Sequence, residues 1–265
     1  MAAAPPVHPH KLRHFYAPFL ALAECSRAVI GTVAGSFKVA DRRYTIPRFT
    51  FLGPRDGGPQ RHIGIFALLH GDEPAGAAAV LGLLQLLAYQ PALGRGYDLV
   101  CYPVCNPTGF EACTRHNHAG LDLNREFWRG SEQPEVVVLE EELRAQHFDG
   151  IIALHADDTS DGLYGYTHGR LFNENLLQPA LRASEGVLPR NPGPVIDGFP
   201  ARDGMISDCF RGVLAPPPDQ DPRPFELIFE TPAQRPLDQQ AEAARLALLT
   251  ILDTHRGFIS YAANL

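Results

Sequence analysis

The stretch Ala67–Gly76, with the sequence ALLHGDEPAG, decides the fold of this chain. The apolar run Ile63–Leu69 is typical of a buried strand, and Pro74 begins a long Ala/Leu segment that is typical of a helix. The strand therefore delivers His70, and Glu73 follows three residues later at the start of the helix. A His-x-x-Glu pair at such a corner can place both side chains over one point, which suits a metal ion with open coordination positions. The same tetrapeptide can also be a polar turn whose carboxylate is favoured by the helix dipole.

The length and composition predict one globular domain over residues 1–265. A chain of 265 residues can bury one sizeable core, and 45% hydrophobic with 20% charged residues is an ordinary globular composition. Residues 1–10 contain three prolines and little that can pack, so we expect a loose arm there. A net charge of -7 argues against a nucleic-acid-binding protein and against an anionic membrane surface. The longest uncharged apolar run, Pro74–Tyr89, is shorter than the roughly 20 residues that cross a bilayer.

The cysteines and the N-terminus predict a cytoplasmic protein. The cysteine number is odd and no C-x-x-C pair occurs, which excludes a disulfide scaffold and a thiolate zinc site: Cys25, Cys101, Cys105, Cys113 and Cys209. Prolines and histidines stand where a secretory signal would have its apolar region.

Alternating strand and helix patterns follow one another along the chain. Helical spacing predicts helices over Lys11–Cys25, Pro74–Tyr89, Val136–His147 and Pro236–Phe258. Strand patterns lie in Val29–Leu52, Arg61–Leu69, Tyr97–Val104, Gly150–Leu154 and Phe225–Phe229, whereas Asn191–Pro224 has little periodicity. This order predicts an α/β fold with a mixed, mostly parallel twisted sheet and helices on both faces.

Four apolar runs end in a polar residue at their carboxyl end: His70, Asn106, His155 and Glu230. In open α/β sheets ligands bind outside the carboxyl ends of the strands, so these side chains are expected to converge on one crevice. Two imidazoles and the Glu73 carboxylate would leave a metal position for water, as catalytic zinc requires. Glu230 could then accept a proton from that water. Taken alone, His155 could instead be a core histidine and Glu230 a surface residue.

Several short motifs between His70 and Thr231 occur in a characteristic order. They are HGDE at His70–Glu73, NPTGF at Asn106–Phe110, Arg115, DLNR at Asp122–Arg125, GSEQPE at Gly130–Glu135, ALH at Ala153–His155 and FET at Phe229–Thr231. In their order and spacing the motifs resemble the M14 zinc carboxypeptidase superfamily, which includes the succinylglutamate desuccinylase and aspartoacylase branch. The resemblance implies a zinc carboxypeptidase-like fold of the phosphorylase/hydrolase-like type.

The resemblance also implies a metal centre and a catalytic base. It assigns His70, Glu73 and His155 as ligands of one zinc ion per chain. Glu230 matches the general base that activates the attacking water and then protonates the leaving amine.

Three further residues match the family's substrate-binding groups. Arg115 matches the arginine that polarises the scissile carbonyl and stabilises the oxyanion. Asn124 and Arg125 match the pair that clamps the free carboxylate of the substrate, for which the planar guanidinium of arginine is suited.

Two activities are compatible with these motifs, because both cleave an amide near a free carboxylate. Only residues 231–265 follow Glu230, which leaves no room for the additional β-rich domain of the deacylase branch. The first expectation is therefore a metallocarboxypeptidase that releases a C-terminal amino acid from a small peptide. The alternative is an N-acyl amino acid deacylase of the succinylglutamate desuccinylase/aspartoacylase type. A metal-binding protein without activity is a third reading, although Arg115 and Glu230 are both retained.

The sequence departs from the carboxypeptidase pattern in one place. Carboxypeptidases commonly have a mobile tyrosine before the catalytic glutamate, but no tyrosine occurs from Thr167 to Glu230. Tyr164 and Tyr166 follow His155 closely and are weak substitutes.

Other polar residues near the motifs are not expected to bind the metal ion. His116 and His118, like Asp157 and Asp158, are interpreted as polar loop residues. The specificity pocket is expected in Ala201–Pro218, where Asp203 or Asp208 would favour a basic group and Arg211 an acidic one.

Overall fold

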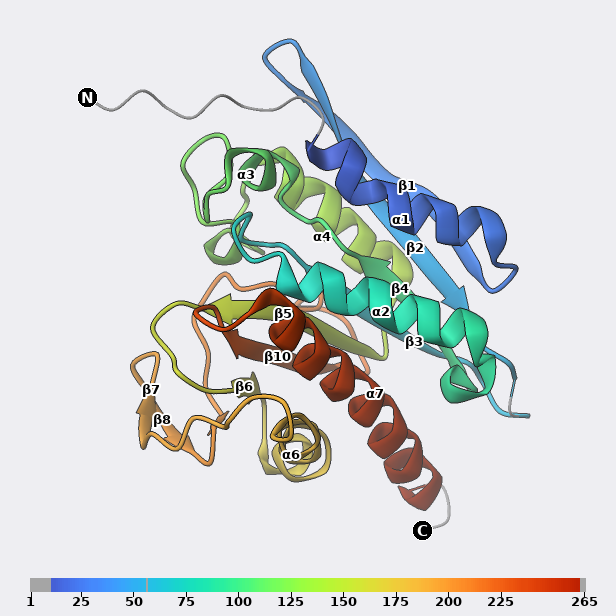
Figure 1. Cartoon of the computed structure of the whole chain (residues 1–265), viewed down its shortest axis with the longest axis vertical. Helices are drawn as coiled ribbons and strands as arrows, with labels where there is room; N and C mark the ends of the chain where they lie inside the picture. The colour runs from blue at the N-terminus through green and yellow to red at the C-terminus, as the bar shows by residue number, and fades with distance from the viewer. Residues whose placement is uncertain (1–10, 56, 263–265) are drawn as a thin grey trace.

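The computed structural model describes residues 11–55 and 57–262, so the predicted loose arm at residues 1–10 lies outside the described residues. The strands are β1 (Val29–Val39), β2 (Arg42–Leu52), β3 (Arg61–Ala67), β4 (Tyr97–Tyr102), β5 (Gly150–Asp157), β6 (Tyr164–Thr167), β7 (Val195–Ile196), β8 (Phe199–Arg202), β9 (Met205–Ile206) and β10 (Phe225–Pro232). They form one mixed sheet in the order β1-β2-β4-β3-β5-β10-β6-β9-β8-β7 (Figure 1).

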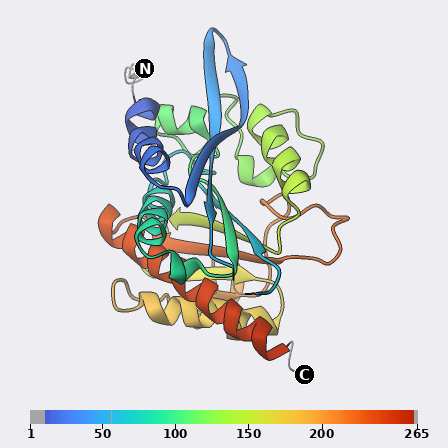
Figure 2. The same cartoon turned by 90° about the vertical axis from the view of Figure 1, so that its right-hand side faces the viewer.

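Helices lie along both faces of this sheet. The α-helices are α1 (Lys11–Cys25), α2 (Ala75–Tyr89), α3 (Pro107–Ala112), α4 (Pro134–Gln146), α5 (Arg170–Phe172), α6 (Gln178–Ser184) and α7 (Leu237–Ala262). Short 3-10 turns at Pro91–Gly94 and Leu123–Arg125 and a π turn at Asn173–Leu177 complete the helical segments. Figure 2 shows the sheet between α1, α2 and α7 on one side and α4 on the other.

The direction of the strands changes across the sheet. The central strands β4, β3, β5 and β10 are parallel, so their carboxyl ends share one edge. Outside this centre the antiparallel pairs are β1 with β2, β2 with β4, β6 with β10, β7 with β8 and β8 with β9. The predicted mixed α/β sheet with helices on both faces is confirmed, and its parallel part is the centre together with the short β6 and β9 pair.

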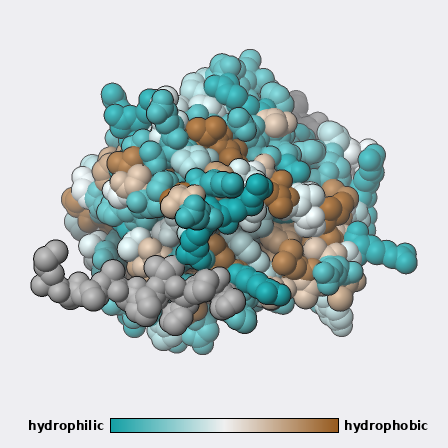
Figure 3. All heavy atoms as spheres, turned by 90° about the horizontal axis from the view of Figure 1, so that it is seen from above, coloured by the Kyte–Doolittle hydropathy of each residue, from teal (hydrophilic) through white to brown (hydrophobic). Residues whose placement is uncertain are grey.

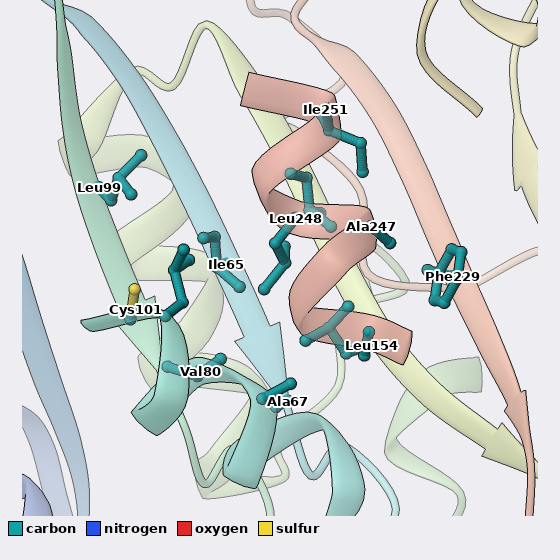
Figure 4. Packing of buried hydrophobic residues seen from close by; sticks show 14 of the residues in the cluster. Ile65, Ala67, Val80, Leu99, Cys101, Leu154, Phe229, Ala247, Leu248 and Ile251 are labelled. Carbon is teal, nitrogen blue, oxygen red and sulfur yellow. The ribbon is translucent and has the colours of Figure 1, made fainter. Parts of the chain in front are cut away.

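Strand alternation divides the buried side chains between two cores. Ile65 and Ala67 of β3 point to the core under α2 and α7, which Figure 4 shows in close-up. Phe66, between them, points to the opposite core against α4 and stacks on Tyr102 with ring centroids 4.6 Å apart. Because both faces of the central strands are buried, these strands read as continuous apolar runs in the sequence.

The segment Asn191–Pro224 contains strands that the sequence did not predict, just as helix α3 at Pro107–Ala112 was not predicted. Three strands of two to four residues lie there, and they are too short for a periodicity to be visible. Asp197 and Asp203, each followed by glycine, have φ values of +49° and +52° and form the turns between these strands. Asp-Gly is the typical sequence for such two-residue hairpin turns. The single-domain assignment over residues 1–265 stays a prediction.

The outer surface is mainly hydrophilic, with hydrophobic groups scattered between polar ones when the molecule is seen from above (Figure 3). Within the described residues, no helix is both long enough and apolar enough to cross a membrane. The apolar segment Ala75–Tyr89 is a buried helix of the core, as its sequence predicted.

His255 of α7 makes stability depend on pH. Its Nδ1 lies 3.0 Å from the Tyr97 hydroxyl and its ring packs 4.9 Å from that of Phe225. Burial, with the Arg61 charge adding to it, lowers the pKa of His255 from 6.5 to about 4. Between pH 6.5 and about pH 4 His255 is protonated in the unfolded chain but neutral in the folded protein. Acid therefore stabilises the unfolded state, and the stability that this residue contributes at neutral pH is lost in this interval.

We expect His255→Phe to remove this part of the pH dependence. Between pH 7 and pH 4 the free energy of unfolding of the native sequence should fall by up to about 3 kcal/mol more than that of the variant. Urea unfolding at several pH values measures this difference. Parallel curves for the two proteins would show that His255 does not titrate in this way.

Candidate active site

The turn after β3 fixes the position of His70. Strand pairing ends at Ala67, and Leu68 adopts a positive φ of +52° that redirects the chain. The backbone amide of Asn106 donates to the Leu68 carbonyl at 2.8 Å, which ties this turn to the end of β4. Gly71 is required because a Cβ there would lie 2.0 Å from the backbone of Gly109. Close backbone approach therefore explains the glycine that follows the histidine.

The three predicted metal ligands meet at one point. Glu73 bridges the two imidazoles, with Oε1 at 2.6 Å from His70 Nδ1 and Oε2 at 3.0 Å from His155 Nδ1. The two Nδ1 atoms are 3.2 Å apart, and all three side chains are buried. A tetrahedral zinc ion with bonds of about 2.0–2.1 Å would separate its ligand atoms by roughly 3.3 Å. The donor set and its spacing therefore fit one zinc ion.

Asp122 orients His70 and was not predicted to have a role. Its Oδ1 lies 3.0 Å from His70 Nε2, so a proton on Nε2 leaves Nδ1 free as a ligand. The same oxygen accepts the backbone amide of Asn124, while Oδ2 accepts from the guanidinium of Arg115 at 3.0 Å. The sequence signal was the carboxylate that begins the DLNR motif, since metal-binding histidines commonly donate to such a group.

Burial and neighbouring charges shift the pKa values of the clustered side chains. Burial raises the pKa of Glu73, but the charges of His155 and His70 outweigh it and hold the pKa below its usual value. Burial also opposes ionisation of Asp122, yet the contacts with His70 and Arg115 keep its pKa low. His155 has a pKa lowered by burial, against the charge of Glu73. Burial lowers the pKa of His70, but the charge of Glu73 and the contact with Asp122 outweigh it and raise this pKa, so a metal ion would have to displace a proton from His70. Glu73 ionised and His155 neutral are the forms that metal binding needs.

Glu230 lies beside this triad on the next strand. In the parallel register of β10 and β5, Glu230 is opposite His155, so both side chains leave the same face of the sheet. Among the described residues no hydrogen-bond or ion-pair partner of the Glu230 carboxyl occurs. Burial and the negative charges of Glu73 and Asp157 raise its pKa well above the usual value.

The two arginines differ in their surroundings. Arg115 is held by Asp122 and lies 3.5 Å from Glu73 Oε1, with 41% of its side chain exposed. Arg125 donates to the Asn124 carbonyl at 2.7 Å and stacks on the Phe210 ring at 4.2 Å. Within the described part of the chain Arg125 has no carboxylate partner. Its guanidinium is therefore available to an anion.

A cavity of about 380 Å³ brings most of the predicted residues together. Its wall contains His70, Glu73, Arg115, Asn124, Arg125 and Glu230, while His155, the third predicted ligand, is not part of the wall but contacts Glu73. The side chain of Asn124 is fixed there by the backbone amide of Leu214, which donates to Oδ1 at 2.8 Å.

The cavity also contains residues that the sequence placed elsewhere. Asp157 and Asp158 are part of its wall, not of a separate polar loop, and Tyr164 donates to Asp157 at 2.8 Å. Tyr166 and Asp197 line it as well. No signal in the sequence pointed to Asp197, because its position depends on how the short strands pair.

Other candidates do not reach the cavity. His116 and His118 are exposed, as expected. Asp203 and Arg211 are exposed away from the wall, and Asp208 lines only a smaller adjacent pocket. Cys209, Phe210 and Val213 of the expected segment Ala201–Pro218 do line the main cavity. The expectation that Asp203, Asp208 or Arg211 sets its charge is wrong, because none of the three belongs to its wall.

Known proteins were compared with this chain by sequence and by structure. Residues 59–163 match the model of the Succinylglutamate desuccinylase/Aspartoacylase catalytic domain. No curated protein matches the chain in sequence. A candidate metallopeptidase of Shewanella amazonensis is similar in structure, with a TM-score of 0.75, 24% identity and coverage of 91% of this chain and 92% of that one.

Two metallo-carboxypeptidases are also similar in structure. The Burkholderia cenocepacia protein has a TM-score of 0.72 and 17% identity over 94% of this chain and 69% of its own. The Pseudomonas aeruginosa protein, in complex with (2-guanidinoethylmercapto)succinic acid, has a TM-score of 0.65 and 19% identity over 91% of this chain and 68% of its own.

The similar structures show that the fold is of the zinc carboxypeptidase type. The catalytic-domain match covers residues 59–163, less than half of the chain, and agrees over that part with the expected resemblance to the succinylglutamate desuccinylase/aspartoacylase branch.

Proposed function

We propose that this protein is a zinc-dependent metallocarboxypeptidase that releases a C-terminal amino acid from a small peptide. One zinc ion would be held by His70, Glu73 and His155. The observation that carries the proposal is that Arg125 and Glu230, both without a charged partner of opposite sign among the described residues, line the same cavity as the triad. A cation that can bind a carboxylate and a carboxyl group that can act as a base therefore share one cavity with the ligand cluster.

Zinc at this site would act as a Lewis acid that polarises a carbonyl and lowers the pKa of water. Glu230 would take the proton of the attacking water and return it to the leaving amine. Its raised pKa makes it a stronger base than an exposed glutamate, which suits both transfers.

The arginines would act on two different parts of the substrate. Arg115 is partly exposed in the cavity beside Glu73, where it would donate to the developing oxyanion. Arg125 would bind the C-terminal carboxylate, with Asn124 beside it. The Pseudomonas aeruginosa relative binds a succinic acid derivative, and a carboxylate-binding cavity in this chain is consistent with that.

An N-acyl amino acid deacylase is the second candidate. The family match over residues 59–163 favours it, because that catalytic domain is named after two deacylases. The same groups would serve, since the substrate again has an amide next to a free carboxylate. Incubation with peptides and with N-acetyl and N-succinyl amino acids, followed by mass spectrometry, separates the two reactions. A cytoplasmic location and the absence of nucleic-acid partners stay predictions.

We expect Arg125→Met to raise KM by roughly ten- to a hundredfold, with a smaller effect on kcat, because a charge-assisted contact with the substrate carboxylate is lost. Methionine keeps an unbranched apolar chain over Phe210. Arg129→Met is a matched control, since Arg129 is exposed and close in sequence but outside the cavity wall. Steady-state kinetics with a peptide and its C-terminal amide test the role of Arg125. Equal turnover of the acid and the amide by the native protein would rule out carboxylate recognition.

A further inference from the structure

The cavity has more negative charge than the proposed reaction uses. Its wall carries two cationic side chains, Arg115 and Arg125, and six carboxylates: Asp72, Glu73, Asp157, Asp158, Asp197 and Glu230. Glu73 and Glu230 have roles as ligand and base. None of the four aspartates makes an ion pair with a cation in the described chain. The remaining field therefore favours a cationic group in the substrate.

The four aspartates are not equivalent in position. Asp72 and Asp157 are next to or within two residues of the metal ligands, and Asp158 follows directly, so these three belong to the metal end of the cavity. Asp197 comes from the turn between β7 and β8, about forty residues further along the chain than Asp157 and Asp158. It is the aspartate that can contact a substrate side chain away from the scissile bond.

Asp197 is held in place by the catalytic region of the sheet. Its Oδ2 accepts from the Tyr166 hydroxyl at 2.6 Å, and Tyr166 is itself buried. Tyr166 pairs with Ile228 in the antiparallel register of β6 and β10, two residues before Glu230. The turn keeps the carboxylate in this place, with φ of +49° at Asp197 and +81° at Gly198. One oxygen is thus bound to a neutral phenol, and the carboxylate charge stays uncompensated.

An apolar path joins the carboxylate anchor to Asp197. Arg125 stacks on Phe210, whose ring centroid is 4.7 Å from that of Phe199. Phe199 in turn meets Tyr166, with ring centroids 6.2 Å apart. Phe210 lines the cavity beside Val213 and Ile228. A residue bound by its carboxylate at one end would lay an aliphatic stem along this apolar wall.

We propose that the cavity selects an amino acid with a cationic side chain, lysine- or arginine-like, and that Asp197 is the specificity-determining residue that binds the cation. This inference rests on the proposed function, because it takes Arg125 as the anchor of the substrate carboxylate. Asp197 replaces Asp203 and Asp208 in the role that the sequence suggested for them. The cavity is a ligand site independently of its aspartates, since the unpartnered Glu230 carboxyl and the Arg125 guanidinium also line it.

Asp197→Asn tests the proposal, with Asp203→Asn as its control. Both aspartates precede glycine in hairpin turns at positive φ, which asparagine tolerates, but only Asp197 lines the cavity. Peptides ending in lysine and in norleucine have the same stem and differ in the ammonium group. The native protein and Asp203→Asn should prefer lysine by roughly tenfold or more in kcat/KM, and Asp197→Asn should lose about tenfold of that ratio. The loss should shrink at high salt, because exposed charges are screened.

A binding measurement separates this proposal from the proposed reaction. The affinities of Nα-acetyl-lysine and Nα-acetyl-norleucine can be compared by calorimetry on zinc-loaded Glu230→Gln protein with and without Asp197→Asn. A lysine preference that depends on Asp197 would support the inference even if no peptide is cleaved. Turnover without a lysine preference, or a preference that survives Asp197→Asn, would overturn the inference and leave the proposed reaction intact.

Discussion

Glu230→Gln is expected to lower kcat/KM for amide hydrolysis by roughly 10²–10⁴-fold, the range that a general acid-base residue contributes. Glutamine keeps the size and polarity of the side chain but cannot accept the proton of the attacking water. Glu230 is not one of the three clustered ligands, so the variant should bind as much zinc as the native protein. A loss of rate at unchanged metal content is the signature of a base, not of a ligand.

Glu226→Gln is the matched control for this variant. Glu226 is on the same strand and faces the same side of the sheet, but it is paired with Arg223 and does not line the main cavity. Kinetics and metal analysis of the three proteins give the comparison. Activity of Glu230→Gln equal to that of Glu226→Gln would contradict the role of Glu230 as the base.

His155→Ala is expected to lower zinc affinity by more than about 100-fold. Removing a partner that only orients a ligand typically costs 10–100-fold, and the loss of a ligand should exceed that. His155 Nδ1 approaches both Glu73 and His70, so without it a carboxylate and one imidazole remain. Hydrolysis should disappear together with the metal.

Competition with a chelator measures the affinity, and His116→Ala serves as the control because that imidazole is exposed on a loop outside the cavity. The ligand assignment fails if His155→Ala binds zinc as tightly as the native protein. It fails equally if both alanine variants weaken binding to the same extent.

The sequence predicted the parts of this site that strand order determines. Ile63–Leu69 and Gly150–Leu154 are uninterrupted apolar runs, so both strands could be predicted, and their parallel pairing places His70 and His155 at one edge. The predicted ends were wrong by two to three residues, because β3 ends at Ala67 and β5 continues through His155 to Asp157. The helix Lys11–Cys25 was predicted with the bounds that the structure has. Functional residues at the carboxyl ends of buried strands can therefore be predicted before the fold is known.

What the sequence could not predict depends on contacts between distant segments. Asp122 meets His70 across 52 residues, and Asp197 meets Tyr166 across 31. Neither pairing follows from local periodicity, because each residue is in an irregular segment whose path is set by packing. The short antiparallel strands at the edge of the sheet could not be predicted either, since a strand as short as Val195–Ile196 has no detectable sequence periodicity.

The most direct test of the account is a zinc titration of metal-free protein in which amide cleavage of a peptide library is followed by mass spectrometry at each step. We predict that release of single C-terminal residues, or of acyl groups for the alternative activity, rises in proportion to bound zinc and stops at one ion per chain. Full zinc binding without cleavage of any amide that neighbours a free carboxylate would contradict the assignment of the triad, Glu230 and Arg125 as a hydrolytic site.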